Sequence, residues 1–337
     1  MLTERLVGVK QVLLPAGVGF ELGYPECLYH KGLVALPDGG VGESLSYSTA
    51  KKLLAPDGSP AKARAPFKGS ASLDFGRVAH GMVTGVGAVV EVLPTTGWLT
   101  SKGELAANGA ATVGYKAAKA EIEARGLTPV SETDWADIQA MQEAILANSE
   151  AADLLTSEGH PEVSLFGVDE PTGTYLRGRA DYWSIQAGAL IDYKTTVKVP
   201  SAHNLERAIW DYHYELQAAW YLELAGQVGI RVDRFVFVFQ EKTPPFSVVV
   251  APLAASAVEK GRDEMRQVID LWADCVASGV WPGPPNLVEV GLPAWVAGRQ
   301  AATGAVPQGA GLVDDDLAAE LAAWAEGPCP LPRNLED

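Results

Sequence analysis

Residues 187–196, AGALIDYKTT, join a short apolar run to a charged end. The apolar residues 189–191 predict a buried strand, which ends in Asp192, Tyr193 and Lys194. Because side chains alternate along a strand, Asp192 and Lys194 share one face and Tyr193 lies on the other. A carboxylate can hold a divalent cation, and an ammonium beside it can lie near an attacking water or a scissile phosphate. The stretch therefore points to metal-assisted hydrolysis, although D-x-K alone is a weak signal that many surface strands carry by chance.

A second strand is predicted upstream, at residues 175–183, and it carries Asp181 close to Arg179. Residues 184–188, between the two runs, predict a hairpin turn. Asp181 and Asp192 are therefore expected on neighbouring antiparallel strands, where side chains that face each other come within contact distance.

A third strand is predicted at residues 161–166, where it offers Glu162, and residues 169–173 follow as a turn. The three strands together predict a carboxylate cluster of Glu162, Asp181 and Asp192. Sites built only from oxygen ligands select hard cations, so the cluster predicts Mg²⁺ or Mn²⁺.

The composition indicates a folded globular protein with one large domain or two smaller ones. The chain has 337 residues, of which 47% are hydrophobic, and this supports a sizeable core. No apolar run approaches the ~20 residues that span a bilayer, and the start MLTERLVGVK lacks a signal-peptide pattern, so no membrane partner is expected. The three scattered cysteines, Cys27, Cys275 and Cys329, fit a reducing, cytoplasmic compartment and exclude a Cys₄ zinc or iron–sulfur site within one chain.

The net charge of −16 argues by itself against a nucleic-acid partner, which usually requires a basic surface. Acidic metal sites add negative charge, however, and an acidic exterior can confine a polyanion to one basic channel. One of the few basic stretches contains Lys51, Lys52, Lys62, Arg64, Lys68 and Arg77. The simpler alternative is that the charge only keeps the protein dissolved.

Periodicity and capping residues predict the remaining elements. Helices are predicted at residues 45–54, with Ser46 or Ser48 as the N-cap, and at 73–85, 103–125, 132–151, 205–225 and 254–278. Further strands are predicted at residues 89–93, 234–240 and 246–250. Short strands or loops are expected over residues 1–40, which include the runs 12–15 and 24–30, and a loop over 55–70.

This order predicts a mixed central sheet flanked by helices, of α/β or α+β class. We expect one domain over residues 1–296, with a helical and loop-rich part at 1–150 and a catalytic core at 160–280. Residues 297–337 predict a flexible tail outside the core, with a small acidic helix at 312–327.

The predicted helix 205–225 is the strongest in the chain. Trp210, Tyr214, Gln217 and Tyr221 repeat at spacings of four, three and four, which places them on one face. Aromatic stripes of this kind are usually core. Gln217 is polar in the middle of the stripe, so its amide is either satisfied by packing partners or points into a site.

These residues resemble the RecE-type (exonuclease VIII-like) branch of the PD-(D/E)xK nucleases, which is related to lambda exonuclease. The resemblance covers roughly residues 44–296, including 292–295, and is carried by Gly76-x-x-x-His80, Glu162, Gly178-Arg179-Ala180-Asp181, Asp192-Tyr193-Lys194-Thr195-Thr196 and Gln217-x-x-x-Tyr221. It implies a PD-(D/E)xK core and Mg²⁺-dependent digestion of linear double-stranded DNA from its ends, 5′ to 3′. The product would be a 3′ single strand for a partner annealing protein. Members of this family form rings around DNA, which would make an acidic outer surface tolerable.

The resemblance also implies roles for single residues. Asp181 and Asp192 would be the principal metal ligands, and Tyr193 would add its backbone carbonyl. Glu162 and His80 would complete or support the shell, which is expected to hold two ions.

Around the metal shell, the resemblance assigns supporting roles. Lys194 would orient the attacking water or help to deprotonate it, and Gln217 and Tyr221 would position the water, the lysine or the DNA backbone. Ser46 and Ser48 align with a segment that contacts the terminal phosphate in relatives. The residues proposed to bind the DNA backbone are Lys51, Lys52, Arg77, Arg177, Arg179 and Lys198.

Three alternatives stay open from the sequence. The chain could be another enzyme of the same superfamily, an endonuclease or a single-strand nuclease joined to an iron–sulfur cluster, and the scattered cysteines argue against the cluster. It could be a DNA-binding scaffold that has lost catalysis, although Asp181, Asp192 and Lys194 are all present. It could be an acidic α/β domain whose charges only decorate its surface. An endonuclease would cut closed circular DNA, and an end-dependent exonuclease would not.

Overall fold

The computed structural model describes residues 18–36, 40–54, 58–65, 71–87 and 89–287. The chain divides into two units, Met1–Pro284 and Pro285–Asp337, and every element below belongs to the first. The predictions for residues 12–15, 292–295, 297–337 and 312–327 lie outside the described residues. None of the described helices is long and apolar enough to cross a membrane.

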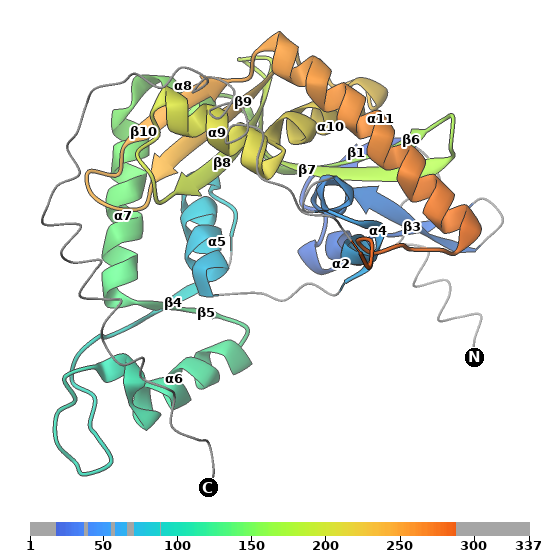
Figure 1. Cartoon of the computed structure of the whole chain (residues 1–337). Coiled ribbons are helices and arrows are strands. Elements are labelled where there is room, and N and C mark those ends of the chain that lie inside the picture. Colours follow the sequence, from blue (N-terminus) through green and yellow to red (C-terminus); the bar gives the residue numbers. More distant parts are fainter. Residues whose placement is uncertain (1–17, 37–39, 55–57, 66–70, 88, 288–337) are drawn as a thin grey trace, which may run out of the picture. The chain divides into compact units, whose positions relative to one another are not determined.

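An eight-stranded mixed sheet forms the centre of the first unit, which confirms the predicted fold class (Figure 1). The strand order is β1-β6-β7-β8-β9-β10, with β3 also beside β7 and β2 beside β3. The bounds are β1 (Gly19–Glu21), β2 (Leu33–Ala35), β3 (Val41–Ser46), β6 (Gly159–Asp169), β7 (Thr174–Ser184), β8 (Ala189–Thr196), β9 (Arg234–Glu241) and β10 (Val248–Pro252). The β8–β9 and β3–β7 pairs are parallel, and the other pairs are antiparallel.

The helices with their bounds are α2 (Glu26–Lys31), α3 (Tyr47–Ala50), α4 (Pro60–Arg64), α5 (Ala71–Thr84), α6 (Val113–Ala124), α7 (Glu132–Ala147), α8 (Ser149–Thr156), α9 (Ala202–Tyr212), α10 (Tyr214–Gln227) and α11 (Ala255–Ser278), with 3₁₀ turns η1 (Lys51–Leu53) and η2 (Gly109–Ala111). A separate two-stranded parallel sheet consists of β4 (Val90–Leu93) and β5 (Thr128–Ser131). The predicted strand at residues 89–93 is therefore confirmed, and β5 was not predicted.

The central sheet forks beside β7. Strand β6 pairs with β7 along its length, so β3 and β8 share the opposite edge of β7. Strand β3 pairs with Tyr175–Arg177 of β7, and β8 pairs with Tyr182–Ser184. Residues 178–181 of β7 therefore lie between the ends of two diverging neighbours, and Asp181 stands at this fork.

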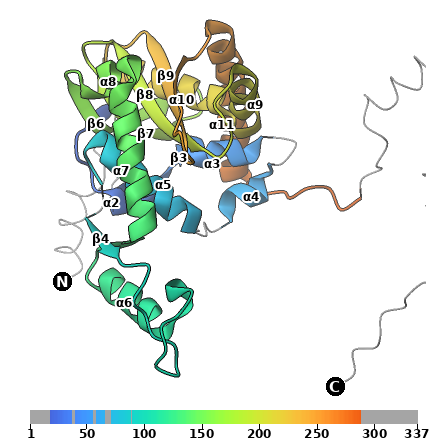
Figure 2. The same cartoon turned by 90° about the vertical axis from the view of Figure 1, so that its left-hand side faces the viewer.

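Both faces of the sheet are buried, as the alternation in β9 shows. Phe235, Phe237 and Phe239 pack with α10 and α11 on one face. Val236 and Val238 pack with α5, α7 and α8 on the other. Figures 1 and 2 show these two helical layers on opposite sides of the sheet. Because strands with two covered faces need apolar residues at every position, β9 is a nearly continuous apolar run.

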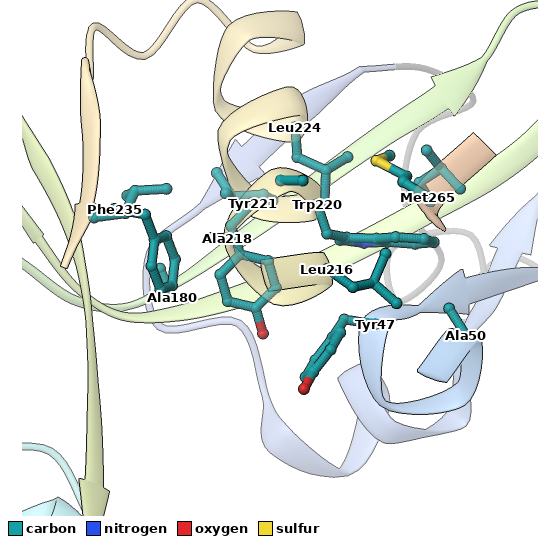
Figure 3. Close-up of a cluster of buried hydrophobic side chains, with 14 of the residues drawn as sticks. Tyr47, Ala50, Ala180, Leu216, Ala218, Trp220, Tyr221, Leu224, Phe235 and Met265 are labelled. Atoms are coloured by element: carbon teal, nitrogen blue, oxygen red, sulfur yellow. The ribbon is translucent and has the colours of Figure 1, made fainter. Parts of the chain in front are cut away.

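Helix α10 is apolar around most of its circumference because it lies between the sheet, α3 and α11. Trp220 is fully buried, and its indole N–H donates a hydrogen bond to the Arg177 carbonyl oxygen at 2.9 Å. Tyr47 from α3 meets Tyr221 edge-on at a ring distance of 6.5 Å (Figure 3). Burial of the Trp220 ring contributes on the order of 4 kcal/mol to folding. These contacts fix the position of α10 on the sheet.

The predicted helix 205–225 is wrong in one respect, because the chain breaks it at His213. This residue has a left-handed backbone (φ 55°), which ends α9 and starts α10 in a new direction. Trp210 consequently lies on α9 and is 58% exposed, so it does not share a face with Gln217 and Tyr221. The predicted helix 132–151 is likewise two helices, because Asn148 caps α8 by accepting a hydrogen bond from the Ala151 amide.

Several other boundaries differ from the prediction. Residues 26–31 form the helix α2 instead of a strand or loop, and the predicted loop at 55–70 contains α4. The predicted helix 103–125 becomes regular only at α6, where Thr112 is the N-cap. In the predicted helix 45–54, Leu45 belongs to β3, and Ser46 caps the short α3. The remaining predicted helices and strands are present, and Ser131 caps α7 as expected from its hydroxyl.

Candidate active site at the fork of the sheet

Asp181 and Asp192 lie side by side on β7 and β8, as predicted. Tyr182 pairs with Ile191 in the antiparallel register, so Asp181 and Asp192 are the next positions toward the fork. The backbone N–H of Tyr193 donates a hydrogen bond to Asp181 Oδ2 at 2.7 Å. The hairpin therefore brings the two carboxyl groups to one end of the β7–β8 pair.

Asp192 is held from two sides. Its side chain is 3% exposed, Lys194 forms an ion pair with Oδ1, and the Gln217 amide donates a hydrogen bond to Oδ2. Burial and the charge of Asp181 raise the pKa of Asp192 to about 6, against the effect of Lys194. For Lys194, burial lowers the pKa and Asp192 raises it, with the net result above the usual value. Lys194 is thus a fixed positive charge at neutral pH.

Tyr214, at the start of α10, is part of this site and was not predicted as such. The Lys194 ammonium lies 5.1 Å from the centre of the Tyr214 ring, in a cation–π contact. Tyr214 was recognised only as one member of an aromatic stripe. Tyr214 lies three residues before Gln217 on the same helix, so both side chains point toward the same strand. This spacing is the sequence signal that could have linked Tyr214 to Lys194.

His80 from α5 connects Asp181 with Glu162. Its Nε2 lies 2.9 Å from Asp181 Oδ2, and its Nδ1 lies 3.4 Å from Glu162 Oε1. Burial lowers the pKa of His80, but Asp181 outweighs this effect and raises the pKa to about 9. Burial likewise raises the pKa of Asp181, and His80 brings it below its usual value. At neutral pH, His80 is therefore an imidazolium between two acidic side chains.

Glu162 has an unusual backbone conformation for an ordinary residue. Its φ is 51°, in the left-handed region, and the β6–β7 ladder skips it between Pro161 and Val163. It stands opposite Asp181, which is the residue that the ladder skips on β7. Such strain is held in place by the surrounding structure and is frequent at functional sites. It turns the Glu162 carboxylate toward His80.

The carboxyl cluster borders a cavity of about 820 Å³. The cavity is wide enough to admit part of a nucleotide chain. Its walls include Asp181, His80, Glu162, Tyr221, Arg179, Ser48 and Arg77. Asp192 and Lys194 lie behind this wall instead of lining it. Tyr221 is 6% exposed, and burial raises the pKa of its phenol well above the usual value.

The residues predicted to contact DNA divide into surface and structural positions. Arg77 and Ser48 are exposed and line the cavity. Ser46 is 4% exposed, and its hydroxyl accepts the Thr49 N–H as the cap of α3. Arg177 is 8% exposed, and its guanidinium donates hydrogen bonds to the backbone carbonyl and hydroxyl of Ser44. Ser46 and Arg177 therefore support the local fold and do not face the cavity.

Arg179 takes part in the wall of the cavity through contacts that the sequence did not predict. Its guanidinium lies 4.3 Å from the Tyr29 ring centre and donates a hydrogen bond to the Tyr24 carbonyl at 2.8 Å. A second guanidinium nitrogen lies 3.8 Å from Glu162. Both tyrosines belong to the stretch that the sequence predicts as strands or loops. The contacts of Arg179 could not be predicted because helix α2, which follows Tyr24, was not predicted.

Three further lysines were predicted to bind the DNA backbone, and none of them lines the cavity of about 820 Å³. Burial and the charge of Lys194 lower the pKa of Lys51. Lys198 follows β8 and lines a separate cavity of about 250 Å³ with Arg207 and Lys242. Lys52 lies beside Lys51 in η1 and is half-buried.

The donor set at the fork fits a hard divalent cation in its chemistry. Two carboxylates are each held against a cationic side chain, and the buried Gln217 Oε1 has no hydrogen-bond partner. A bound cation would take over the charge compensation that His80 and Lys194 now provide. No three of the predicted ligands, however, have ligand atoms that all lie within 4.8 Å of one another. Among the residues that the structure describes, such a group is formed by His213, Glu215 and Glu264.

Comparison with known proteins bears on the fold and the family of the chain. A solved structure from Eubacterium rectale, described as "Putative exonuclease", aligns with a TM-score of 0.51 and 13% identity, over 82% of this chain and 93% of that chain. A second solved structure, SSO0001, aligns over 52% of this chain and 81% of that chain at 15% identity, and its TM-score of 0.26 supports no conclusion. No curated protein matches in sequence. The first likeness, at this identity, concerns the fold alone.

The family model of a "PDDEXK-like domain of unknown function (DUF3799)" matches residues 46–290. This segment contains Asp181, Asp192 and Lys194 and covers most of the chain. The match confirms the superfamily that the sequence motifs indicated. The chain therefore belongs to the family of PDDEXK-like domains of unknown function (DUF3799), within the PD-(D/E)xK nuclease superfamily.

Proposed function

We propose that this protein is a metal-dependent exonuclease that degrades linear double-stranded DNA from its ends, 5′ to 3′. The observation that carries the proposal is the arrangement of Asp181, Asp192 and Lys194 at the fork, next to a cavity of about 820 Å³. Two carboxylates and a fixed ammonium are the groups that phosphodiester hydrolysis requires.

Different side chains would bind the cation and balance the charges around it. Asp181, Asp192 and the backbone carbonyl of Tyr193 would hold Mg²⁺ or Mn²⁺, with Glu162 and His80 completing the shell for one ion or two. A cation bound there supplies a water of lowered pKa and neutralises charge on the phosphate. Asp181, with a pKa below its usual value, keeps its negative charge available for this purpose at neutral pH.

Lys194 would orient the attacking water and stabilise the charge that gathers on the phosphorane-like transition state. Its ammonium is positioned by the Asp192 carboxylate and the Tyr214 ring, so it would need little reorganisation during the reaction. Gln217 fixes the other oxygen of Asp192, and the Tyr221 hydroxyl would border the substrate.

DNA would enter through the cavity, guided by charge and not by base sequence. Arg77, Arg179 and Ser48 line the walls and would contact backbone phosphates. Lys51, Lys52 and Lys198 would extend this path along the other side of the site. Phosphate contacts of this kind give affinity that falls steeply with salt.

The wider role follows from the resemblance to RecE-type exonucleases. The 3′ single strand left by digestion would serve recombination by strand annealing, with a separate annealing protein as partner. We propose that several copies of the chain form a ring around the DNA. With a net charge of −16, such a ring would repel DNA from its exterior and admit it only at basic positions of the channel.

The test is digestion of a linear duplex labelled at either the 5′ or the 3′ end, with Mg²⁺, beside a covalently closed circle of the same sequence. We expect early release of the 5′ label, later release of the 3′ label, and an intact circle. Cutting of the circle would identify an endonuclease instead. Full digestion in the presence of a chelator, or no digestion of any DNA with Mg²⁺ or Mn²⁺, would contradict the proposal.

A further inference from the structure

A second group of potential ligands lies where α10 begins, away from the cavity beside Asp181. It consists of His213, which precedes α10, Glu215 in the first turn of α10, and Glu264 on α11. One ligand atom from each of the three lies within 4.8 Å of the other two. Helices α10 and α11 pack against each other (Figure 1), and Gly261 of α11 lies against Glu215 of α10.

The carboxylates of Glu215 and Glu264 are buried, and three of their four oxygens lack a hydrogen-bond donor. The side chains of Glu215 and Glu264 are 3% and 5% exposed. Neither carboxylate oxygen of Glu215 has a hydrogen-bond partner, and Glu264 Oε2 and His213 Nδ1 also have none. An unpaired polar group in such a position destabilises the fold, and the effect is larger when the group is charged. The cluster therefore requires a further positive group or a proton.

The neighbouring cations supply only part of this charge. Lys260 lies 2.9 Å from Glu264 Oε1, and its side chain is 46% exposed. His213 Nδ1 lies 3.6 Å from Glu215 and 3.7 Å from Glu264, longer than a hydrogen bond. Each of the three residues therefore has at least one polar atom without a hydrogen-bond partner, in a group whose ligand atoms lie within 4.8 Å of one another.

We propose that His213, Glu215 and Glu264 bind a divalent transition cation, with Zn²⁺ as the ion that fits best. One imidazole nitrogen and two carboxylate oxygens form a ligand set that suits Zn²⁺. An imidazole ligand disfavours Mg²⁺ and Ca²⁺, which prefer oxygen ligands only. The proposed zinc site is separate from the proposed nuclease site. None of its three residues borders the cavity of about 820 Å³, so the zinc proposal does not rest on the nuclease function.

The cation would fasten the start of α10 to α11. A Cβ added at Gly261 of α11 would collide with the carbonyl oxygen of Glu215, so the two helices already touch at the backbone there. Helix α10 carries Tyr214, Gln217 and Tyr221 toward the fork. A clamp at its first turn would therefore hold Tyr214 and Gln217 against Lys194 and Asp192 of β8.

The test is the zinc content of the full-length protein. Metal-free protein is incubated with Zn²⁺ in a large excess of Mg²⁺, which occupies oxygen-only sites, and bound zinc is counted after gel filtration. We expect one zinc ion per chain in the wild type and in the variants Lys194→Ala and Glu259→Gln. Glu259 is an exposed acid on the same helix α11 and serves as the matched control.

The ligand variants should lose this ion. Glu215→Gln and Glu264→Gln keep the size of the side chain and remove one charge, and we expect zinc affinity to fall at least about tenfold. His213→Asn tests the third ligand, because asparagine tolerates the left-handed backbone at this position. Zinc content that is unchanged in all three variants, or a wild type that binds none, would overturn the proposal.

Thermal unfolding separates loss of the ligand from loss of the fold. Zinc should raise the melting temperature of the wild type and of Glu259→Gln, and leave that of Glu215→Gln and His213→Asn unchanged. The alternative is a proton shared between Glu215 and Glu264. In that case, Glu215→Gln would melt at or above the wild-type temperature and zinc would stabilise neither protein, which contradicts the proposal.

Discussion

The side-chain amide of Gln217 donates a hydrogen bond to Asp192 and so joins helix α10 to strand β8. Both residues are nearly inaccessible to solvent, at 2% exposure each. Leu216 and Trp220, on the same helix, are fully buried in the core. The packing of α10 therefore determines the position of the carboxylate, which links the stability of the core to the proposed chemistry.

We expect Gln217→Ala to lower the rate of DNA cleavage by about 10–100-fold while the protein stays folded. The variant removes a donor from Asp192 Oδ2, so this carboxylate loses its fixed orientation and its pKa rises further above 6. Steady-state kinetics should show the loss in kcat and little change in KM. The matched control is Gln267→Ala, an exposed glutamine on α11, and an equal loss in both variants would contradict a role for Gln217.

We expect Gly178→Ala to destabilise the fold by about 1–3 kcal/mol. A Cβ at this position would lie 2.9 Å from the Tyr221 ring and 3.0 Å from Leu224, so α10 would have to move away from β7. Urea unfolding measures the effect. Gly226→Ala on α10 is the control, because a Cβ there meets nothing within 4 Å and alanine favours a helix. Equal stability of the two variants would show that α10 is not packed as described.

The pKa of His80 predicts a specific dependence of stability on pH. Its folded-state pKa of about 9 lies above the ordinary value of 6.5, so the charged form is favoured by folding. The contribution of about 3 kcal/mol is fully present below pH 6.5 and is lost as the pH rises through about 9. The difference in unfolding free energy between the wild type and His80→Gln should shrink by this amount between about pH 6 and about pH 10, measured in a chelator.

Exposed His203 provides the comparison for this measurement. The variant His203→Gln makes the same substitution at an exposed position and controls for the loss of a histidine side chain. A difference for His80→Gln that does not change with pH would mean that the His80 imidazole is not held by Asp181.

We expect Arg77→Ala to weaken DNA binding without changing the rate of the chemical step. Arg77 lines the cavity and would contact one phosphate, so the slope of log Kd against log salt should fall by about one. Fluorescence anisotropy with a labelled duplex at several salt concentrations measures this slope. Lys116→Ala, at an exposed position on α6, should leave the slope unchanged, and an identical slope in Arg77→Ala would exclude the phosphate contact.

Strand and turn patterns were enough to predict the centre of the sheet. The alternation around Asp192 and the turn at residues 184–188 predicted the β7–β8 hairpin, and the capping residue Ser131 located the start of α7. These motifs are short stretches of sequence, and short stretches are enough to predict which strand or helix carries a given residue. They also indicated the superfamily, which the family match confirms.

Long-range contacts could not be predicted in the same way. The parallel pairing of β3 with β7 joins segments far apart in sequence, and the fork exists only because of that pairing. The contact between Lys194 and Tyr214 depends on the break at His213, where no glycine or proline marks a helix end. Arg177 was predicted to face DNA, but the Ser44 contacts that bury it come from β3.

The most direct measurement is the rate of nucleotide release from linear duplex DNA by the wild type, Lys194→Ala and Lys116→Ala at the same Mg²⁺ concentration. Circular dichroism confirms that each protein is folded. The account predicts equal rates for the wild type and Lys116→Ala, and a loss of about 100–1,000-fold or more for Lys194→Ala. A folded Lys194→Ala protein that digests DNA at the wild-type rate would show that the fork between β7 and β8 is not the catalytic centre.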